Sequence, residues 1–348
     1  MTSRDLVKKT LEFRSPERVP RQLWTLPWAT NNHPEQLAEI QRRFPDDIVG
    51  APSCLRSQPR KQGDPYVVGT FVDEWGCVFV NVQAGVHGEV KEPALPDWDR
   101  VGEVRFPEEA LTVDVDAVNA FCRNTDKFVI AGACPRPFER LQFYRNSENL
   151  YTDLGENRPE MLAFLKRLHE FYLKELEIWV QTDVDALTFM DDWGAQRALL
   201  ISPAMWRKLF KPLYKDYIDI AHRHGKAIFM HSDGFITPII GDLVELGLDA
   251  LNCQLFTMDI EALGRQFAGK ITFWGEIDRQ YLLPSGTPAD IDEAVRRVKE
   301  ALWRDGGAIA QCEFGPGGRP ENVYQVYQTW EDLGHGFHRH LHLRAVQV

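Results

Sequence analysis

The chain has 348 residues, of which 44% are hydrophobic and 26% charged, and its formal net charge is -11. This composition is typical of a globular protein with a large core, and the acidic balance argues against nucleic acid as a partner because phosphate binding needs a basic stripe. No run reaches the length of a membrane span, the charged start "MTSRDLVKKTLEF" has no apolar signal region, and the six cysteines form no CxxC pair. We therefore predict a cytoplasmic protein with free thiols that contacts neither membrane nor nucleic acid.

Eight short apolar runs alternate along the chain with longer stretches, several of which carry apolar residues at helical spacing. The runs occupy residues 21–26, 47–51, 127–132, 186–190, 226–230, 249–253, 270–275 and 307–312, and helical patterns include residues 158–182 and 288–305. Short buried strands that alternate with helices indicate a parallel sheet. Eight such units favour one domain over residues 1–348, an α/β (β/α)8 TIM barrel, and an open doubly wound sheet is the alternative.

One segment interrupts this alternation. Residues 64–95 alternate in the manner of β-strands and carry glycines at turn spacing, which predicts a β-hairpin inserted after the second barrel strand. In a barrel such an insertion lies over the carboxyl ends of the strands, where sites are built.

Reactive side chains follow four of the predicted strands. The stretch "KAIFMHSDGF" ends its strand on His231 and Asp233, and the other strand ends carry Asp191-Asp192-Trp193, Glu276 and Cys312-Glu313. A polar turn before the next helix would account for each of these stretches taken alone. Together, however, an imidazole, a thiol and several carboxylates are the ligand types of catalytic zinc sites, and they should converge at one end of the barrel.

These residues carry a resemblance to the uroporphyrinogen decarboxylase superfamily, which also contains zinc- and cobalamin-dependent methyltransferases. The most specific segments are "HSDGFITPIIGDLVELGLDALN" and "CEFGPGGRPENVYQVYQTW", with "GTFVDEWGCVF" and "GACPRPFERLQFYR" as further matches. The resemblance covers nearly the whole chain and implies the barrel fold.

The resemblance is closer to the methyltransferase branch. Decarboxylases of the family carry an arginine-rich block near the N-terminus that holds the substrate's carboxylates, whereas "PRQLWTLPWATNN" offers one arginine, Arg21, beside Trp24 and Trp28. Cys312 stands where those decarboxylases have a histidine and where the methyltransferases have a zinc-binding cysteine. The methyltransferases take their other ligands from an H-x-C motif, in which this chain keeps His231 and replaces the cysteine with Asp233.

The resemblance therefore implies a zinc site with His231, Glu276 and Cys312 as preferred ligands. Asp233 has three open roles: a ligand through oxygen, a group that orients His231, or a cap for the following helix. Fewer thiolates would make the zinc a stronger Lewis acid, which suits activation of an ether or alcohol oxygen.

The function implied is a zinc-dependent methyltransferase that moves a methyl group between a small, possibly methoxylated substrate or a thiol and a corrinoid (methylcobalamin) on a partner protein. Candidate acid–base or hydrogen-bonding groups are Asp73, Asp191 and Asp192. Trp24, Trp75, Trp193 and Trp274 are candidates for an aromatic wall around the substrate, or else they only pack loops. Cys134, at another strand end, is a candidate pocket residue.

Two alternatives stay open. One is a metal-free decarboxylase of a different acid, with Asp73 and His231 acting on the substrate directly. The other is a barrel without catalysis that serves as a binding module. Relatives are often dimers, so a homodimer is a further expectation.

Overall fold

The structure is a computed structural model that describes the backbone of residues 1–344 and the side chains of residues 1–334. Its main sheet has eight strands: β1 (Arg21–Thr25), β2 (Ile48–Gly50), β6 (Phe128–Ile130), β7 (Ala186–Met190), β8 (Ala227–Ser232), β9 (Ala250–Cys253), β10 (Thr272–Trp274) and β11 (Ala308–Phe314). They follow the order β1-β11-β10-β9-β8-β7-β6-β2, and every neighbouring pair is parallel.

The end strands β1 and β2 meet and nearly close this sheet into a barrel. The Asp47 backbone N–H donates to the Arg21 carbonyl oxygen at 2.8 Å, and the Leu23 N–H donates to Asp46 Oδ1 at 2.7 Å. The predicted TIM barrel is confirmed, with a strand in each of the eight expected runs, and the open doubly wound sheet was the wrong alternative.

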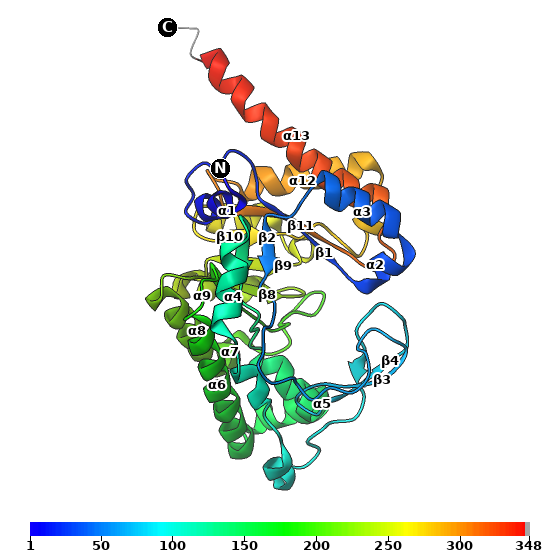
Figure 1. The fold of residues 1–348 in the computed structure, drawn as a ribbon, viewed down its shortest axis with the longest axis vertical. Coiled ribbons are helices and arrows are strands. Elements are labelled where there is room, and N and C mark those ends of the chain that lie inside the picture. Colours follow the sequence, from blue (N-terminus) through cyan, green and yellow to red (C-terminus); the bar gives the residue numbers. More distant parts are fainter. Residues whose placement is uncertain (345–348) are drawn as a thin grey trace.

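Parallel strands need crossover connections, and helices supply them here. Figure 1 shows these helices around the strands. They are α1 (Ser3–Leu11), α2 (Pro27–Asn32), α3 (Pro34–Arg43), α4 (Val115–Arg123), α5 (Pro137–Glu156), α6 (Pro159–Trp179), α7 (Pro203–Leu209), α8 (Lys211–Arg223), α9 (Thr237–Leu246), α10 (Ile260–Phe267), α11 (Leu282–Ser285), α12 (Pro288–Leu302) and α13 (Pro320–Arg344), with short 3-10 turns η1 (Trp98–Glu103), η2 (Glu108–Leu111) and η3 (Leu255–Thr257). None of the described helices is long and apolar enough to cross a membrane.

The two faces of the barrel strands pack into two different hydrophobic clusters of described residues. The smaller one holds interior side chains from most of the strands, including Ala186 on β7, Phe229 on β8 and Ile309 on β11. The larger one lies between the strands and the helices. Side chains alternate along a strand between the barrel interior and the helix layer, and the alternation continues to the strand ends. Positions 192, 231, 233 and 313 therefore face the interior, and positions 191 and 312 face the helices.

The inserted hairpin predicted over residues 64–95 is confirmed and is extended by a third strand. β3 (Gly69–Val72), β4 (Val78–Asn81) and β5 (Glu89–Val90) form a small antiparallel sheet in which Phe71 pairs with Phe79. In Figure 1 this sheet curls beside the barrel near α5. The insertion forms one wall of the cavity described below.

Candidate metal centre and adjoining cavity

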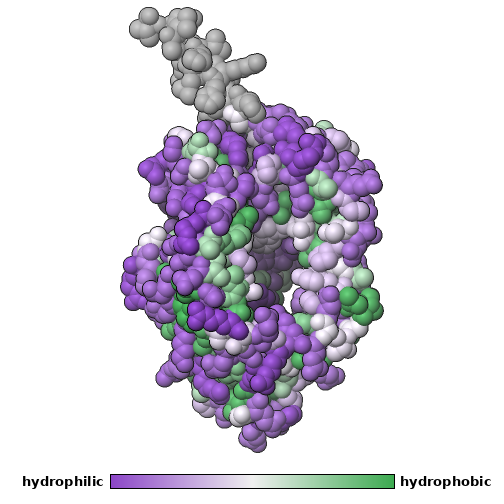
Figure 2. Space-filling view, in the orientation of Figure 1, coloured by the Kyte–Doolittle hydropathy of each residue, from purple (hydrophilic) through white to green (hydrophobic). Residues whose placement is uncertain are grey.

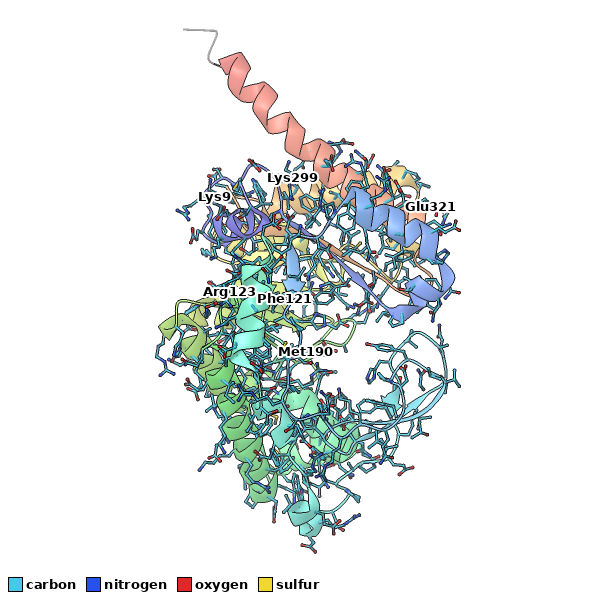
Figure 3. All side chains as sticks on the ribbon, viewed as in Figure 1. Lys9, Phe121, Arg123, Met190, Lys299 and Glu321 are labelled. Atoms are coloured by element: carbon cyan, nitrogen blue, oxygen red, sulfur yellow. The ribbon has the colours of Figure 1, made fainter. Side chains whose placement is uncertain are left out.

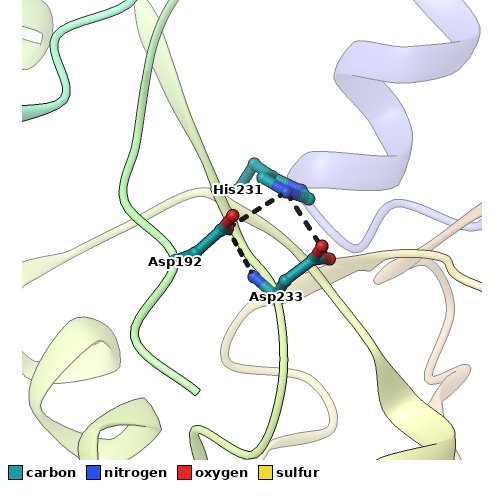
Figure 4. A group of neighbouring side chains, drawn as sticks. All are labelled: Asp192, His231 and Asp233. Atoms are coloured by element: carbon teal, nitrogen blue, oxygen red, sulfur yellow. Dashed lines mark hydrogen bonds and ion pairs between the residues drawn. The ribbon is translucent and has the colours of Figure 1, made fainter. Parts of the chain in front are cut away.

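Three side chains converge at the carboxyl ends of β7 and β8 (Figure 4). Asp192, His231 and Asp233 each offer a ligand atom, and these atoms all lie within 4.8 Å of one another. His231 Nε2 lies 3.4 Å from Asp192 Oδ1 and 3.6 Å from Asp233 Oδ1. One imidazole and two carboxylates in this arrangement fit a divalent cation with open positions for substrate.

The orientation of the His231 ring is set by Asn252 on β9. The Asn252 side-chain amide donates to the Trp274 carbonyl oxygen, so its Oδ1 is left to face His231 Nδ1, at 2.6 Å. Nδ1 therefore carries a proton and donates, which leaves Nε2 as the ring atom that can bind a cation. Metal-binding histidines in proteins are held by partners of this kind.

Only one of the two carboxylate oxygens of Asp233 has a hydrogen-bond partner among the described residues. Its Oδ2 accepts from Arg279 Nη2, whereas its Oδ1 is buried and has no hydrogen-bond partner among the described residues. A buried carboxylate oxygen without a partner is costly, and a cation would satisfy it. The capping role for Asp233 is not supported, because α9 begins at Thr237 after Ile236.

Two glycines bring the loops after β7 and β8 into contact. The Gly194 N–H donates to the Asp233 carbonyl oxygen at 3.0 Å. A Cβ on Gly234, whose φ is +77°, would lie 2.1 Å from the Gly194 carbonyl oxygen. Only glycine fits such a close approach in the left-handed region, and this contact helps to hold Asp192 and Asp233 together.

The charges of the cluster favour a cation. Burial lowers the pKa of His231, but Asp192 and Asp233 outweigh it and raise that pKa to about 9. Burial also opposes ionisation of Asp192, yet its interaction with His231 brings the pKa of Asp192 below the ordinary value. The two carboxylates that hold a proton on Nε2 would stabilise a metal ion at the same place.

Glu276 lies beside this cluster and reaches it through Arg279. The Arg279 guanidinium contacts Asp233, Glu276 Oε2 at 3.4 Å and Glu313 Oε1 at 3.5 Å. Glu276 is 2% exposed, and burial raises its pKa to about 8. The predicted metal ligand Glu276 therefore lies next to the Arg279 guanidinium.

The structure does not bring Cys312 to the cluster. Its thiol is fully buried and lies 3.7 Å from the hydroxyl of Tyr327 on α13, which in turn donates to the Gln22 carbonyl oxygen at 2.9 Å. Burial raises the pKa of Cys312 to about 12, so the group is a neutral thiol. The strand parity explains this, because position 312 faces the helix layer and its neighbour Glu313 faces the barrel interior.

Asp191 and Trp193 also face the helices. Asp191 Oδ2 accepts from the Tyr214 hydroxyl at 2.6 Å, and Oδ1 accepts from the Glu139 backbone N–H in the first turn of α5 at 2.8 Å. Trp193 donates from Nε1 to Tyr214 at 2.8 Å and stacks on Phe138 at 4.2 Å between ring centroids. Both side chains pack in the layer between the strands and the helices. Asp191 is therefore not placed for its predicted catalytic role, nor Trp193 for its predicted contact with substrate.

A cavity of about 1020 Å³ opens between the inserted sheet, α5 and α6, and Figure 2 shows a hollow in this face of the molecule. The cavity reaches the barrel at Cys134 after β6, confirming the expectation for that cysteine, and at Met190 on β7, which Figure 3 labels. Trp75, a candidate for the aromatic wall, also lines this cavity.

Asp73 lines the same cavity, but both of its oxygens are engaged. Oδ1 accepts the backbone N–H groups of Trp75 and Cys77 at 3.0 and 2.7 Å, and Oδ2 accepts from Arg140 at 2.6 Å. Asp73 and Arg140 are both buried, so this ion pair fixes the inserted sheet to α5. The contacts give Asp73 a structural role in place of the predicted acid–base role.

Trp24 and Trp274 form an aromatic wall inside the barrel mouth. Their rings meet edge to face at 5.0 Å, and the Trp24 ring lies 5.4 Å from that of His231. Gln22 Oε1 accepts from both indole N–H groups, at 3.1 and 3.0 Å. These two predicted tryptophans therefore lie at the cluster, held by one glutamine.

Several functional candidates were missed from the sequence. Asn252 lies on the interior face of its strand, so counting alternate residues along "DALNC" would have found it, whereas Glu313 was named at its strand end but given no role. Arg279 and Arg136 lie in loops, and Glu139 lies in the first turn of α5, where the alternation of side chains along a strand gives no signal.

Comparison with known proteins agrees with this architecture. Residues 71–332 match the family described as Uroporphyrinogen decarboxylase (URO-D), and the chain belongs to that family. Among solved structures, a methyltransferase from Methanosarcina mazei is similar over 96% of this chain and 99% of its own length, with a TM-score of 0.67 and 14% identity. That likeness establishes a shared fold.

Other solved structures share less. A structure described as the IOLI protein with a binding zinc atom covers 65% of this chain and 82% of its own length at 17% identity and a TM-score of 0.32. A dihydropteroate synthase from Xanthomonas albilineans covers 50% of this chain and 61% of its own length at 11% identity and a TM-score of 0.30. None of the curated proteins matches this sequence significantly.

Proposed function

We propose that this protein is a zinc-dependent methyltransferase that moves a methyl group between a small substrate and a corrinoid carried by a partner protein. The observation that carries the proposal is the cluster of Asp192, His231 and Asp233, in which Asp233 Oδ1 is buried without a hydrogen-bond partner and lies 3.6 Å from His231 Nε2. The methyltransferase from Methanosarcina mazei, which shares the whole fold, is consistent with this choice.

His231 Nε2, Asp192 Oδ1 and Asp233 Oδ1 are the atoms that would hold the metal. A bound zinc ion would supply a Lewis acid that polarises the oxygen or sulfur of the substrate. The docked corrinoid would supply the cobalt that accepts or donates the methyl group. Trp24 and Trp274 keep one side of the cluster apolar, which strengthens electrostatic interactions there.

Glu139 is placed to manage a proton. When an ether loses its methyl group, the C–O bond breaks, the oxygen keeps the electron pair, and that oxygen then gains a proton. Glu139 lines the cavity, its Oε2 is buried without a hydrogen-bond partner, and it interacts electrostatically with Asp192 and His231. Burial raises the pKa of Glu139, so its carboxyl group is suited to hold the proton that the oxygen receives.

A decarboxylase of a substrate with many carboxylates is less well supported. Arg21 is the one arginine in the stretch where decarboxylases of the family have an arginine-rich block, and it forms an ion pair with Glu331 on α13 at 3.2 Å. This leaves the β1 end of the barrel mouth with Trp24 in place of a free guanidinium.

Metal content tests the proposal directly. Wild type, His231→Ala and the control His224→Ala, at an exposed position on the far end of α8, are purified without chelators. We expect about one zinc per chain in wild type and the control, and an almost complete loss in His231→Ala. Failure of wild type to bind zinc, even when zinc is offered under anaerobic conditions, would overturn the metal mechanism.

A further inference from the structure

Among the described residues, the arginine Arg136 has no anionic partner closer than 3.8 Å. Arg136 directly precedes α5 and lines the cavity, and its one ion pair among the described residues is a 3.8 Å contact from Nη1 to Glu139 Oε2. The neighbouring Arg140 differs, because its guanidinium is bound to Asp73 at 2.6 Å. Arg136 is therefore available to a ligand, whereas Arg140 belongs to the wall.

Aromatic side chains line the same cavity as Arg136. The cavity lining includes Phe71 and Phe79 from the inserted sheet, Phe143 from α5, and Phe171 and Tyr172 from α6. The Tyr172 hydroxyl is buried and has no hydrogen-bond partner among the described residues. Flat rings with a few polar groups between them suit a planar aromatic ligand that offers hydrogen-bonding oxygens.

Burial disfavours the charged form of two acids that line the cavity with Arg136. Glu175 on α6 also lines the cavity, and burial raises its pKa to about 8, with a further contribution from Glu74. Burial likewise raises the pKa of Glu139. Glu175 is therefore mostly protonated at neutral pH, and burial shifts Glu139 in the same direction, which reduces the repulsion that a ligand carboxylate near Arg136 would meet.

We propose that this cavity binds an aromatic carboxylate and that Arg136 is the residue that takes its carboxylate group. Arginine suits this role because its planar fork binds carboxylates through two hydrogen bonds. Glu139 lines the same cavity and interacts electrostatically with Arg136, Asp192 and His231, so this part of the cavity adjoins the candidate metal centre. This inference rests on the proposed function and names the substrate class as methoxylated aromatic acids.

Binding to the metal-free full-length chain tests the substrate class apart from catalysis. Isothermal titration compares 4-methoxybenzoate with 4-methoxybenzyl alcohol, which has the same ring and ether but no charge. We expect wild type to bind the benzoate at least about 10-fold more tightly than the alcohol. Arg136→Gln should remove that preference and change the affinity for the alcohol by less than about 3-fold.

Two further variants complete the test. Arg100→Gln, at an exposed arginine paired with Glu103 on η1, should leave both affinities unchanged. Arg136→Lys keeps the charge without the planar fork, so it should retain part of the preference, and it carries the test if Arg136→Gln does not fold.

The failures of the two proposals are distinguishable. Equal affinity of wild type for the benzoate and the alcohol, equal loss of both in Arg136→Gln, or tighter binding of benzyltrimethylammonium would overturn the aromatic-acid assignment. If the protein binds zinc and transfers a methyl group but does not prefer the benzoate, only the aromatic-acid assignment fails. If the protein prefers the benzoate but binds no zinc, only the metal mechanism fails.

Discussion

Asp191 and Asp192 are neighbours in sequence, and the structure gives them opposite surroundings. Asp191 faces the helix layer, is fully buried, and uses both oxygens to bind Tyr214 and the first turn of α5. Asp192 faces the barrel mouth, is partly exposed, and shares one oxygen between His231 and the backbone of Asp233. A polar side chain with every partner in place stabilises the fold, while one with an incomplete set of partners can take a ligand.

The same contrast separates Cys312 from Glu313. Cys312 is paired with Tyr327 in the outer layer, whereas Glu313 contacts Arg279 beside the candidate metal centre. In both pairs a single step along the strand moves a side chain from the packing layer to the site. The following predictions test this division, from the largest expected effect to the smallest.

Asp191→Ala should be the most damaging change to folding. The substitution leaves the Tyr214 hydroxyl and the Glu139 N–H buried without an acceptor, which should lower the unfolding free energy by about 3–5 kcal/mol. Urea denaturation measures this cost. Zinc bound per folded chain should stay within about 3-fold of wild type; a large loss of zinc with normal stability would contradict the division.

Asp192→Ala should show the reverse behaviour. Zinc affinity should fall by about 100-fold, equivalent to about 2.7 kcal/mol, because one of three ligand atoms is lost. The unfolding free energy of the metal-free chain should change by less than about 1 kcal/mol, since relief of a crowded charge cluster offsets the lost contact with His231. Competition with a chromogenic chelator gives the affinity, and an unchanged value would remove Asp192 from the ligand set.

Asn252→Ala should weaken zinc binding without removing a ligand. The variant frees the His231 ring to rotate, because Nδ1 loses the oxygen that fixes it. Losses of about 10- to 100-fold are typical when such a supporting hydrogen bond is removed. Asn252→Asp, which keeps the acceptor oxygen, should recover part of the affinity. If both variants bind zinc as wild type does, the ring is held in some other way.

Cys312→Ser should leave zinc content within about 2-fold of wild type, because the thiol is bound to Tyr327 on the far side of the strand. This experiment distinguishes the metal ligands that the structure brings together, Asp192, His231 and Asp233, from the set implied by the family resemblance, which includes Cys312. Loss of zinc in a folded Cys312→Ser protein would return the cysteine to the ligand set.

The affinity for 4-methoxybenzoate should decrease by a few-fold as the pH rises through about 8. Glu175 has a raised pKa, so it is neutral below this pH, and above it the new carboxylate repels the ligand and competes for Arg136. The groups that face it are Glu74, Cys134, Arg136, Tyr172 and Tyr217. Titrations between about pH 6.5 and about pH 9.5 should show the decrease in wild type and a flat profile in Glu175→Gln.

The sequence by itself determined the barrel, its eight strands, the inserted hairpin and the family, because hydrophobic periodicity and turn residues act locally along the chain. It also located His231, Asp192 and Asp233 as groups at strand ends.

Only the tertiary structure decided which of the predicted side chains meet. Cys312, Asp191 and Trp193 lie at strand ends as expected, but they face the helices, and Asp73 is taken by Arg140. Arg279 and Arg136 come from separate loops, and their neighbours depend on how the strands and the insertion pack. A residue's type sets what chemistry it can perform, but its partners, and hence its free lone pairs and charge, come from residues distant in the chain.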